Sequence, residues 1–202
     1  FRNGDKRNDP KPGVAKYHDG TVEFHENWLD KPWKPGDGSD ERYNNDFFGG
    51  DLAGIIDKLD YIRDLGANTI YMTPLFRAAS NHKYDTADYK TIDPAFGRQA
   101  DFARLAREAR RRGMRILPDT SFNHVGSDSP YFDRYGNWPE RGAFEGGQVD
   151  AGSPFASWFR FDTSKTHPDE QYAFWGGPEL PATDKNSAAF RRFIFGAPDS
   201  VT

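Results

Sequence analysis

The sequence predicts an α/β fold built around a parallel sheet, and three observations support this prediction. Two short β-prone runs, residues 68–74 and 115–119, each follow a stretch with helical periodicity. The connections from helix to strand are short, which is typical of parallel sheets. Polar side chains crowd the segments after both runs. Barrels and doubly wound folds keep their chemistry at these carboxyl ends of the strands.

The chain of 202 residues is polar but rich in aromatic side chains. Mean hydropathy is -0.88 and hydrophobic residues make up 36%, below the usual share for a globular chain. Aromatic residues make up 15%, which argues against disorder. Aromatic rings stack on the apolar faces of sugars while their polar tips hydrogen-bond, although core rings in a loop-rich fold give the same count.

Composition also excludes several classes of protein. The net charge of -4 argues against a nucleic-acid partner. No run of 18 apolar residues occurs, so the sequence predicts no membrane partner and no membrane-spanning segment. The absence of cysteine excludes disulfides and thiolate metal sites. It leaves the compartment open, with an extracytoplasmic location slightly favoured over a cytoplasmic one.

The first half of the chain predicts a loop region, a helix and a strand. Residues 1–48 are rich in Asn, Asp, Gly, Pro and Lys and lack periodicity, so they predict a long ordered loop region. A helix follows Asp51 and ends before Gly66. Its apolar face consists of Leu52, Ile55, Ile56, Leu59, Ile62 and Leu65. Residues 68–74 then form a strand that ends at a proline.

The next segment predicts a polar loop over residues 75–98 and a helix over residues 99–112. That helix places Phe102, Leu105 and Ala109 on one face, and Gly113 ends it. A second strand follows over residues 115–119.

The regular alternation stops over residues 120–183. A structureless loop of that length is unusual inside a compact domain, so a small inserted subdomain is the better interpretation. The last predicted element is a helix from Asn186 to Phe195, with Asn186 as its N-cap.

Three motifs stand in a fixed order along the chain. They are FFGGDLAGII at residues 47–56, SNHKYDTADY at residues 80–89 and DTSFNH at residues 119–124. In this order and spacing they resemble the α-amylase family, glycoside hydrolase family 13. The closer likeness is to its neopullulanase, cyclomaltodextrinase, maltogenic amylase and amylopullulanase branch. The resemblance covers nearly the whole chain and loosens in its last third.

This resemblance implies part of a (β/α)8 TIM barrel, with strands two and three present and a small domain inserted after strand three. Residues 1–119 are then the first part of the catalytic barrel. Residues 120–183 are the inserted domain B, and residues 184–202 start the helix that returns to the barrel.

The resemblance also implies a retaining α-glucan hydrolase that acts on α-1,4, and possibly α-1,6, bonds of starch, pullulan or maltodextrins. Retaining cleavage needs two carboxyl groups about 5–5.5 Å apart. The family takes its catalytic Asp, Glu and Asp from strands four, five and seven, and no segment here reads as its Gly-x-Arg-x-Asp motif. We therefore expect no catalytic residue in this chain. The C-terminal barrel part of the same enzyme would carry the carboxylates, and these residues alone would be inactive.

Two alternatives stay open at this point. A glycosyltransferring enzyme of the same family would pass the sugar to an acceptor sugar instead of water. A non-catalytic amylase-like protein would bind an α-glucan oligosaccharide or polysaccharide without cleaving it.

The N-terminal loop predicts a metal site. Four oxygen-bearing side chains lie close together around a glycine at residues 3–9. Ca²⁺ takes 6–8 oxygen ligands, whereas Mg²⁺ demands stricter geometry. The resemblance implies a Ca²⁺ site with the ligands Asn3, Asp5, Asn8, Asp9, Gly49 (through its carbonyl) and Asp51. The alternative is an Asx-rich turn without metal.

The resemblance assigns sugar-binding roles after both strands. It implies that Tyr84 stacks beneath the glucose whose bond is cleaved and that His82 hydrogen-bonds a hydroxyl of that glucose. His124 contacts the same glucose, and Asp119 supports the site by pairing with an arginine near the nucleophile.

Two further positions leave questions for the structure. Trp175 would either stack on sugar at the rim of the cleft or pack inside the inserted domain. Ser121 stands where the family usually has valine, so its hydroxyl needs a hydrogen-bond partner.

Overall fold

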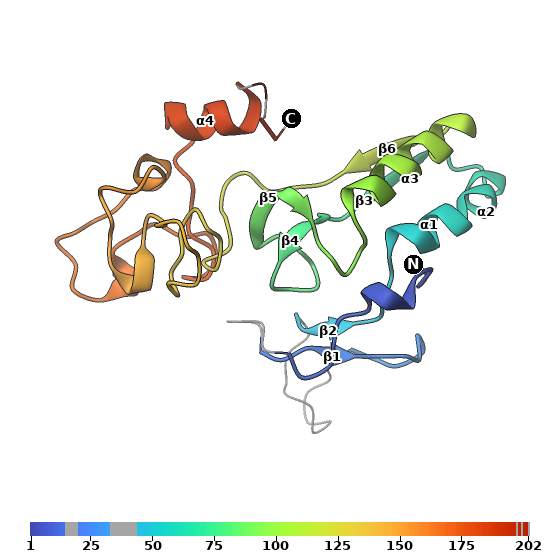
Figure 1. Ribbon diagram of the computed structural model, residues 1–202, viewed down its shortest axis with the longest axis horizontal. Coiled ribbons are helices and arrows are strands. Elements are labelled where there is room, and N and C mark those ends of the chain that lie inside the picture. The colour runs from blue at the N-terminus through green and yellow to red at the C-terminus, as the bar shows by residue number, and fades with distance from the viewer. Residues whose placement is uncertain (15–19, 33–43, 197, 199, 202) are drawn as a thin grey trace. The chain divides into compact units, whose positions relative to one another are not determined.

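The computed structural model describes residues 1–14, 20–32, 44–196, 198 and 200–201 (Figure 1). It divides into two compact units. Unit 1 consists of Phe1–Lys83 and Thr91–Thr120, and unit 2 of Tyr84–Lys90 and Ser121–Thr202. The domain boundaries expected after residues 119 and 183 stay a prediction.

The parallel sheet that the sequence predicts lies in unit 1. Strands β3 (Thr69–Met72) and β6 (Arg115–Pro118) pair in parallel, with Thr69 opposite Arg115 and Met72 opposite Pro118. The intervening chain contains a helix, as a crossover between parallel strands requires. This pairing brings the two polar segments to the same end of the sheet.

The first predicted helix is divided into α1 (Leu52–Asp57) and α2 (Leu59–Asp64). Lys58 interrupts it with φ -112° and ψ 9°. The second predicted helix is confirmed as α3 (Gln99–Arg111), with Leu105 and Ala109 buried.

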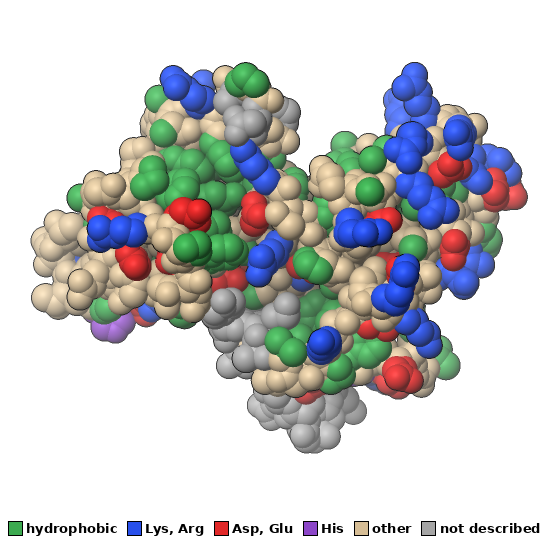
Figure 2. Space-filling model, viewed as in Figure 1, with side chains coloured by type: hydrophobic (Ala, Val, Ile, Leu, Met, Phe, Trp, Pro, Cys, Tyr) green, Lys and Arg blue, Asp and Glu red, His purple; other side chains and the backbone are tan. Residues whose placement is uncertain are grey.

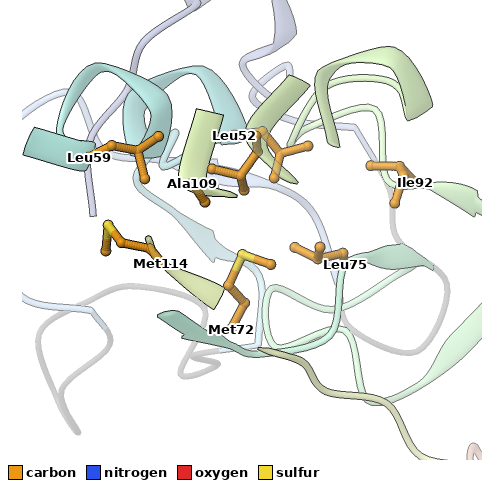
Figure 3. Close-up of a cluster of buried hydrophobic side chains, with 8 residues drawn as sticks. Leu52, Leu59, Met72, Leu75, Ile92, Ala109 and Met114 are labelled. Atoms are coloured by element: carbon orange, nitrogen blue, oxygen red, sulfur yellow. The ribbon is translucent and has the colours of Figure 1, made fainter. Parts of the chain in front are cut away.

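These elements enclose one hydrophobic core in unit 1 (Figure 3). Side chains from α1, α2 and α3 pack against those of β3 and the loops around it. The buried members are Leu52, Leu59, Met72, Leu75, Ile92, Leu105, Ala109 and Met114. Most of the predicted apolar face therefore packs into this core, but Leu65 does not, because it lies at the C-terminal cap of α2 and is 69% exposed.

The prediction of a polar loop over residues 75–98 is wrong in part, because this segment contains two strands. Strands β4 (Phe76–Ala78) and β5 (Thr86–Ile92) form a two-stranded sheet. The sequence did not reveal β5 because polar residues of this strand, such as the fully buried Thr86, break the apolar pattern expected of a buried strand.

The N-terminal region also contains short regular elements where a loop was expected. A 3-10 helix η1 spans Lys6–Asn8. Strands β1 (Glu23–Phe24) and β2 (Asp46–Phe47) pair in parallel. Residues 15–19 and 33–43 of the predicted loop region lie outside the described residues.

Unit 2 is held together mainly by aromatic packing. Between Ser121 and α4 (Ala188–Phe195), its described helices are the 3-10 turns η3 (Glu145–Gly147), η4 (Ala156–Trp158) and η5 (Pro168–Glu170). Phe132 and Phe144 are fully buried and stack with ring centroids 5.1 Å apart. Tyr172 meets both rings edge-on, at 4.7 and 5.0 Å. The core of unit 2 thus accounts for part of the high aromatic content.

Helix α4 begins two residues later than predicted, and its cap is Ser187 instead of Asn186. The Ser187 side chain accepts a hydrogen bond from the Phe190 N–H, whereas the Asn186 N–H donates to Asp184. Asn186 lies outside the first turn, so its side chain does not reach the free N–H groups.

Replacing the Ser187 cap lowers stability. We expect Ser187→Ala to reduce the free energy of unfolding by about 1 kcal/mol, because one N–H of α4 loses its acceptor. Urea unfolding followed by circular dichroism measures the change. Ser187→Thr keeps the hydroxyl and serves as the control, and equal stability of the two variants would contradict the cap.

Figure 2 shows Lys and Arg side chains gathered on the surface of unit 1. Helix α3 exposes Arg104, Arg107 and Arg110. This face of α3 is solvated, opposite the buried Leu105. Among the described residues, the helices are too short or too polar for any of them to cross a membrane.

Candidate functional site

The predicted metal loop is anchored by Asp51, a buried carboxylate at the start of α1. Its side chain accepts a hydrogen bond from the Gly54 N–H at 2.6 Å, which makes it the N-cap of α1. It also accepts from the N–H groups of Gly4 at 2.9 Å and Asp5 at 2.8 Å. One side chain therefore joins the N-terminal segment to the first helix.

Two predicted ligand atoms lie buried in this loop without a hydrogen-bond partner. They are the Oδ1 atoms of Asn3 and Asn8. The Asn3 side-chain amide donates to Asp9 at 2.6 Å, and the Asn8 amide donates to Asp51 at 3.3 Å. A buried oxygen without a donor is costly, and a cation would satisfy it.

Gly49 lies against the same side chains. A Cβ atom at this position would come within 2.5 Å of Asn3 Nδ2 and 2.9 Å of Asp9 Oδ1. Its φ of +70° is also a conformation that favours glycine. Gly49 is therefore brought next to two of the predicted ligands.

Asp5 differs from the other predicted metal ligands because an arginine side chain already binds its carboxylate. Its carboxylate binds the Arg7 guanidinium, with Arg7 Nε 2.7 Å and Nη2 2.6 Å from its two oxygens. These hydrogen bonds lower the pKa of Asp5 to about 2. The carboxylate is thus ionised at neutral pH, as a metal ligand must be.

The donor set suits a hard cation that binds oxygen. It combines carboxylates, amide oxygens and one backbone carbonyl, the mixture that Ca²⁺ takes in proteins. The two partnerless amide oxygens are the observation that favours such an ion over a metal-free turn.

In unit 2, the His124 ring and the Ser121 hydroxyl both contact the backbone carbonyl of Tyr84. The Nε2 atom of His124, a buried residue, lies 3.1 Å from the Tyr84 carbonyl oxygen. The Ser121 hydroxyl donates to the same carbonyl at 2.9 Å and lies 3.4 Å from His124 Nε2. Ser121 therefore finds the partner that its hydroxyl requires, and it links two predicted sugar-binding residues.

Trp175 stacks on His124. The two rings lie 5.4 Å apart with an interplanar angle of 9°, and Trp175 remains 60% exposed. At this exposure Trp175 does not pack inside the core of unit 2, and its predicted contact with sugar stays a prediction. The sequence could not show the stack, because the two residues are far apart along the chain.

His82 lies in unit 1, in a loop whose conformation is stabilised by the buried side chain of Lys83. Its Nδ1 atom lies 3.1 Å from the Ser80 hydroxyl. The next residue, Lys83, is 1% exposed and has a φ of 64°. Its ammonium pairs with Asp93 at 2.7 Å and donates to the Ala78 carbonyl at 3.1 Å. This buried pair fixes the loop that carries His82 and Tyr84.

Asp119, the predicted supporting residue, follows β6. Its Oδ2 atom accepts a hydrogen bond from the Tyr71 hydroxyl at 2.6 Å. Tyr71 lies on β3, so the pairing of the two strands positions the carboxylate. The sequence reasoning did not assign this role to Tyr71.

A parallel α/β unit with polar residues at the carboxyl edge of its strands is typical of α/β enzymes, including barrels. Comparison with known families is more specific. The family described as "Alpha amylase, catalytic domain" matches residues 1–193. The chain belongs to the α-amylase family, and its fold is part of the (β/α)8 barrel of that family.

Individual relatives agree with the predicted branch. The chain is 38% identical to an amylopullulanase of Thermoanaerobacterium saccharolyticum, over 100% of this chain and 16% of the relative. It is 53% identical to an intracellular maltogenic amylase of Bacillus subtilis, over 53% of this chain and 19% of the relative. The type III pullulan hydrolase of Thermococcus kodakarensis superposes with a TM-score of 0.74 at 30% identity, over 95% of this chain and 32% of that chain. The chain thus spans a minor part of each relative.

Proposed function

We propose that this chain is the sugar-binding and metal-binding front part of a retaining α-glucan hydrolase. The enzyme would cleave α-1,4 bonds, and possibly α-1,6 bonds, of starch, pullulan or maltodextrins. The names of the amylopullulanase and the pullulan hydrolase support these substrates. The remainder of the same enzyme would supply the catalytic Asp, Glu and Asp.

The observation that carries this proposal is the stack of Trp175 on His124 beside Tyr84. An exposed indole presents an apolar face that suits a pyranose ring. The His124 imidazole can donate and accept hydrogen bonds, but it is buried with Nε2 against the Tyr84 carbonyl, so its contact with a sugar hydroxyl would require the ring or its cover to move. Because Trp175 covers one face of His124, it restricts the orientation of that imidazole. In this account His82 and Tyr84 keep the sugar contacts that the family resemblance implies.

Ca²⁺ is part of the proposal as a structural ion. Asn3, Asp5, Asn8, Asp9, the Gly49 carbonyl and Asp51 would hold it, and the partnerless oxygens of Asn3 and Asn8 support this. The ion would neutralise the carboxylates and fix the N-terminal loop against α1. For Asp5 to bind the ion, its carboxylate must release at least part of its contact with Arg7.

Trp175→Ala tests the sugar-binding role in the enzyme that contains this chain. We expect the KM for maltodextrin to rise about 2- to 10-fold, since the loss of one aromatic stacking contact is worth about 0.5–1.5 kcal/mol. Initial rates of reducing-sugar release measure KM and kcat, and the melting temperature reports folding.

Tyr61→Ala is the matched control, because Tyr61 is an exposed aromatic residue on α2. It should leave KM unchanged. If Trp175→Ala lowered the melting temperature and left KM at the wild-type value, Trp175 would be a packing residue and the proposed role would be wrong.

A further inference from the structure

A second cluster of metal-ligand side chains lies on the paired strands β1 and β2. Glu23, His25 and Asp46 each place one ligand atom within 4.8 Å of the others. Figure 1 shows these two strands side by side. We propose that the three residues form a binding site for one Zn²⁺ ion. This site is separate in its ligands from the proposed calcium loop and does not depend on the function of the enzyme.

The backbone places the three side chains on one face. Glu23 is the direct partner of Asp46 in the parallel register. The Glu23 N–H donates to Asn45 O at 2.9 Å, and the His25 N–H donates to Phe47 O at 2.8 Å. His25 is two residues after Glu23, and residues two apart share a face of an extended strand. The ladder therefore fixes the spacing of the ligands before any ion binds.

The charges in this cluster favour a cation. Two carboxylates directly opposite each other on neighbouring strands repel, and Asp46 is 3% exposed. Among the residues that the structure describes, the Glu23 carboxylate has no hydrogen-bond donor and no ion-pair partner. His25 Nε2 lies 2.7 Å from Asp46 Oδ1, so an ion bound here would separate this contact and take both atoms as ligands.

The surroundings of His25 match those of a metal-binding histidine. Such a histidine usually donates its second ring N–H to a carboxylate or a carbonyl, which fixes the orientation of the ring. The Nδ1 atom of His25 lies 3.6 Å from Asp30 Oδ2. Asp30 is itself held by the Asn27 side chain at 3.0 Å. On its flank, the imidazole stacks on Phe48 with centroids 4.6 Å apart.

The imidazole ligand decides which class of ion fits. Ca²⁺ and Mg²⁺ take oxygen ligands, whereas imidazole suits Zn²⁺ and neighbouring transition metals. Tetrahedral Zn²⁺ with ligands at about 2.0–2.2 Å needs ligand atoms about 3.3 Å apart. Side-chain rotation would open the His25–Asp46 contact of 2.7 Å and bring the other ligand atoms, which lie within 4.8 Å of one another, to that value. Water would complete the four ligands.

Titration of the metal-stripped protein with ZnCl2, with Ca²⁺ held in excess, tests this proposal. We expect one equivalent of Zn²⁺ to bind by calorimetry and to raise the melting temperature. His25→Gln should weaken binding at least 10-fold and remove the shift in melting temperature. The control is His167→Gln, which changes an exposed histidine of unit 2 and should bind like the wild type.

Two further measurements keep the test decisive if His25→Gln folds poorly. Asp30→Asn changes an exposed residue and should weaken Zn²⁺ binding about 10- to 100-fold, as expected when the partner of a ligating histidine is lost. Co²⁺ should replace Zn²⁺ and give visible absorption bands, which Asp30→Asn alters and His167→Gln does not. Wild-type protein without stoichiometric Zn²⁺ binding would overturn the proposal, as would equal affinities of the His25, Asp30 and His167 variants.

Discussion

We expect removal of calcium to lower the melting temperature of the enzyme that contains this chain. A ligand present at about 1,000 times its dissociation constant contributes about 4 kcal/mol to stability, and this contribution disappears on chelation. A loss of 1 kcal/mol shifts the melting temperature of a 150–250-residue domain by about 2–4 °C and that of a longer chain by less, so the expected fall is at most roughly 8–16 °C. The physical reason lies in Asn3 and Asn8, whose buried oxygens would lose the proposed ion and have no hydrogen-bond partner to replace it. Differential scanning calorimetry with and without EGTA measures the change.

Asp9→Ala distinguishes this calcium effect from other losses. Asp9 binds Asn3, whereas Asp51 also caps α1, so a change at Asp51 would destabilise the helix regardless of any ion. We expect Asp9→Ala to melt at a lower temperature and to lose its response to EGTA. Asp64→Ala, at an exposed aspartate of α2, should keep the full response. Adding back Ca²⁺ should restore the wild type, whereas any rise caused by Zn²⁺ should be the same in the wild type and in Asp9→Ala. Because EGTA also binds Zn²⁺, the protein is first stripped of Zn²⁺, and an EGTA response that then survives in Asp9→Ala would show that the loop is not the site.

Lys83→Met produces the second large effect. Removing one partner of a buried ion pair costs about 3–5 kcal/mol, because the remaining charge is left buried without compensation. Here the remaining charge is that of Asp93, which still accepts from the Ala78 and Ala95 N–H groups. We expect the free energy of unfolding, measured in urea, to fall by that amount. The loop that carries His82 and Tyr84 should then lose its fixed conformation.

Two comparisons test the origin of this loss. Lys165→Met changes an exposed lysine and should shift stability by less than about 0.5 kcal/mol. Adding Asp93→Asn to Lys83→Met should recover part of the loss, since a neutral amide no longer leaves a buried charge. If Lys83→Met were as stable as Lys165→Met, the pair would not organise the loop.

The sequence predicted those elements whose signal is local and periodic. Leu105 and Ala109 repeat at helical spacing and are buried in α3. The runs ending at Pro74 and Asp119 became β3 and β6, paired in parallel. Here the period of the apolar residues and the stop residues agree with the tertiary structure.

The remaining features depend on contacts that no local pattern shows. Strand β5 was missed because buried polar residues such as Thr86 interrupt its apolar alternation. Lys58 breaks the first helix although the apolar period continues through it. The stack of Trp175 on His124 joins distant residues. The cluster of Glu23, His25 and Asp46 depends on a register between two strands that no hairpin connects.

The most direct test of the central claim is the reaction of maltoheptaose with the enzyme that contains this chain, followed by time-resolved proton NMR. The account predicts that the substrate is cleaved and that products carry the α-anomer before mutarotation, as a retaining mechanism at an α-glycosidic bond requires. Products that first appear as the β-anomer would contradict the mechanism. Binding of maltoheptaose without cleavage would contradict the assignment of the enzyme as a hydrolase.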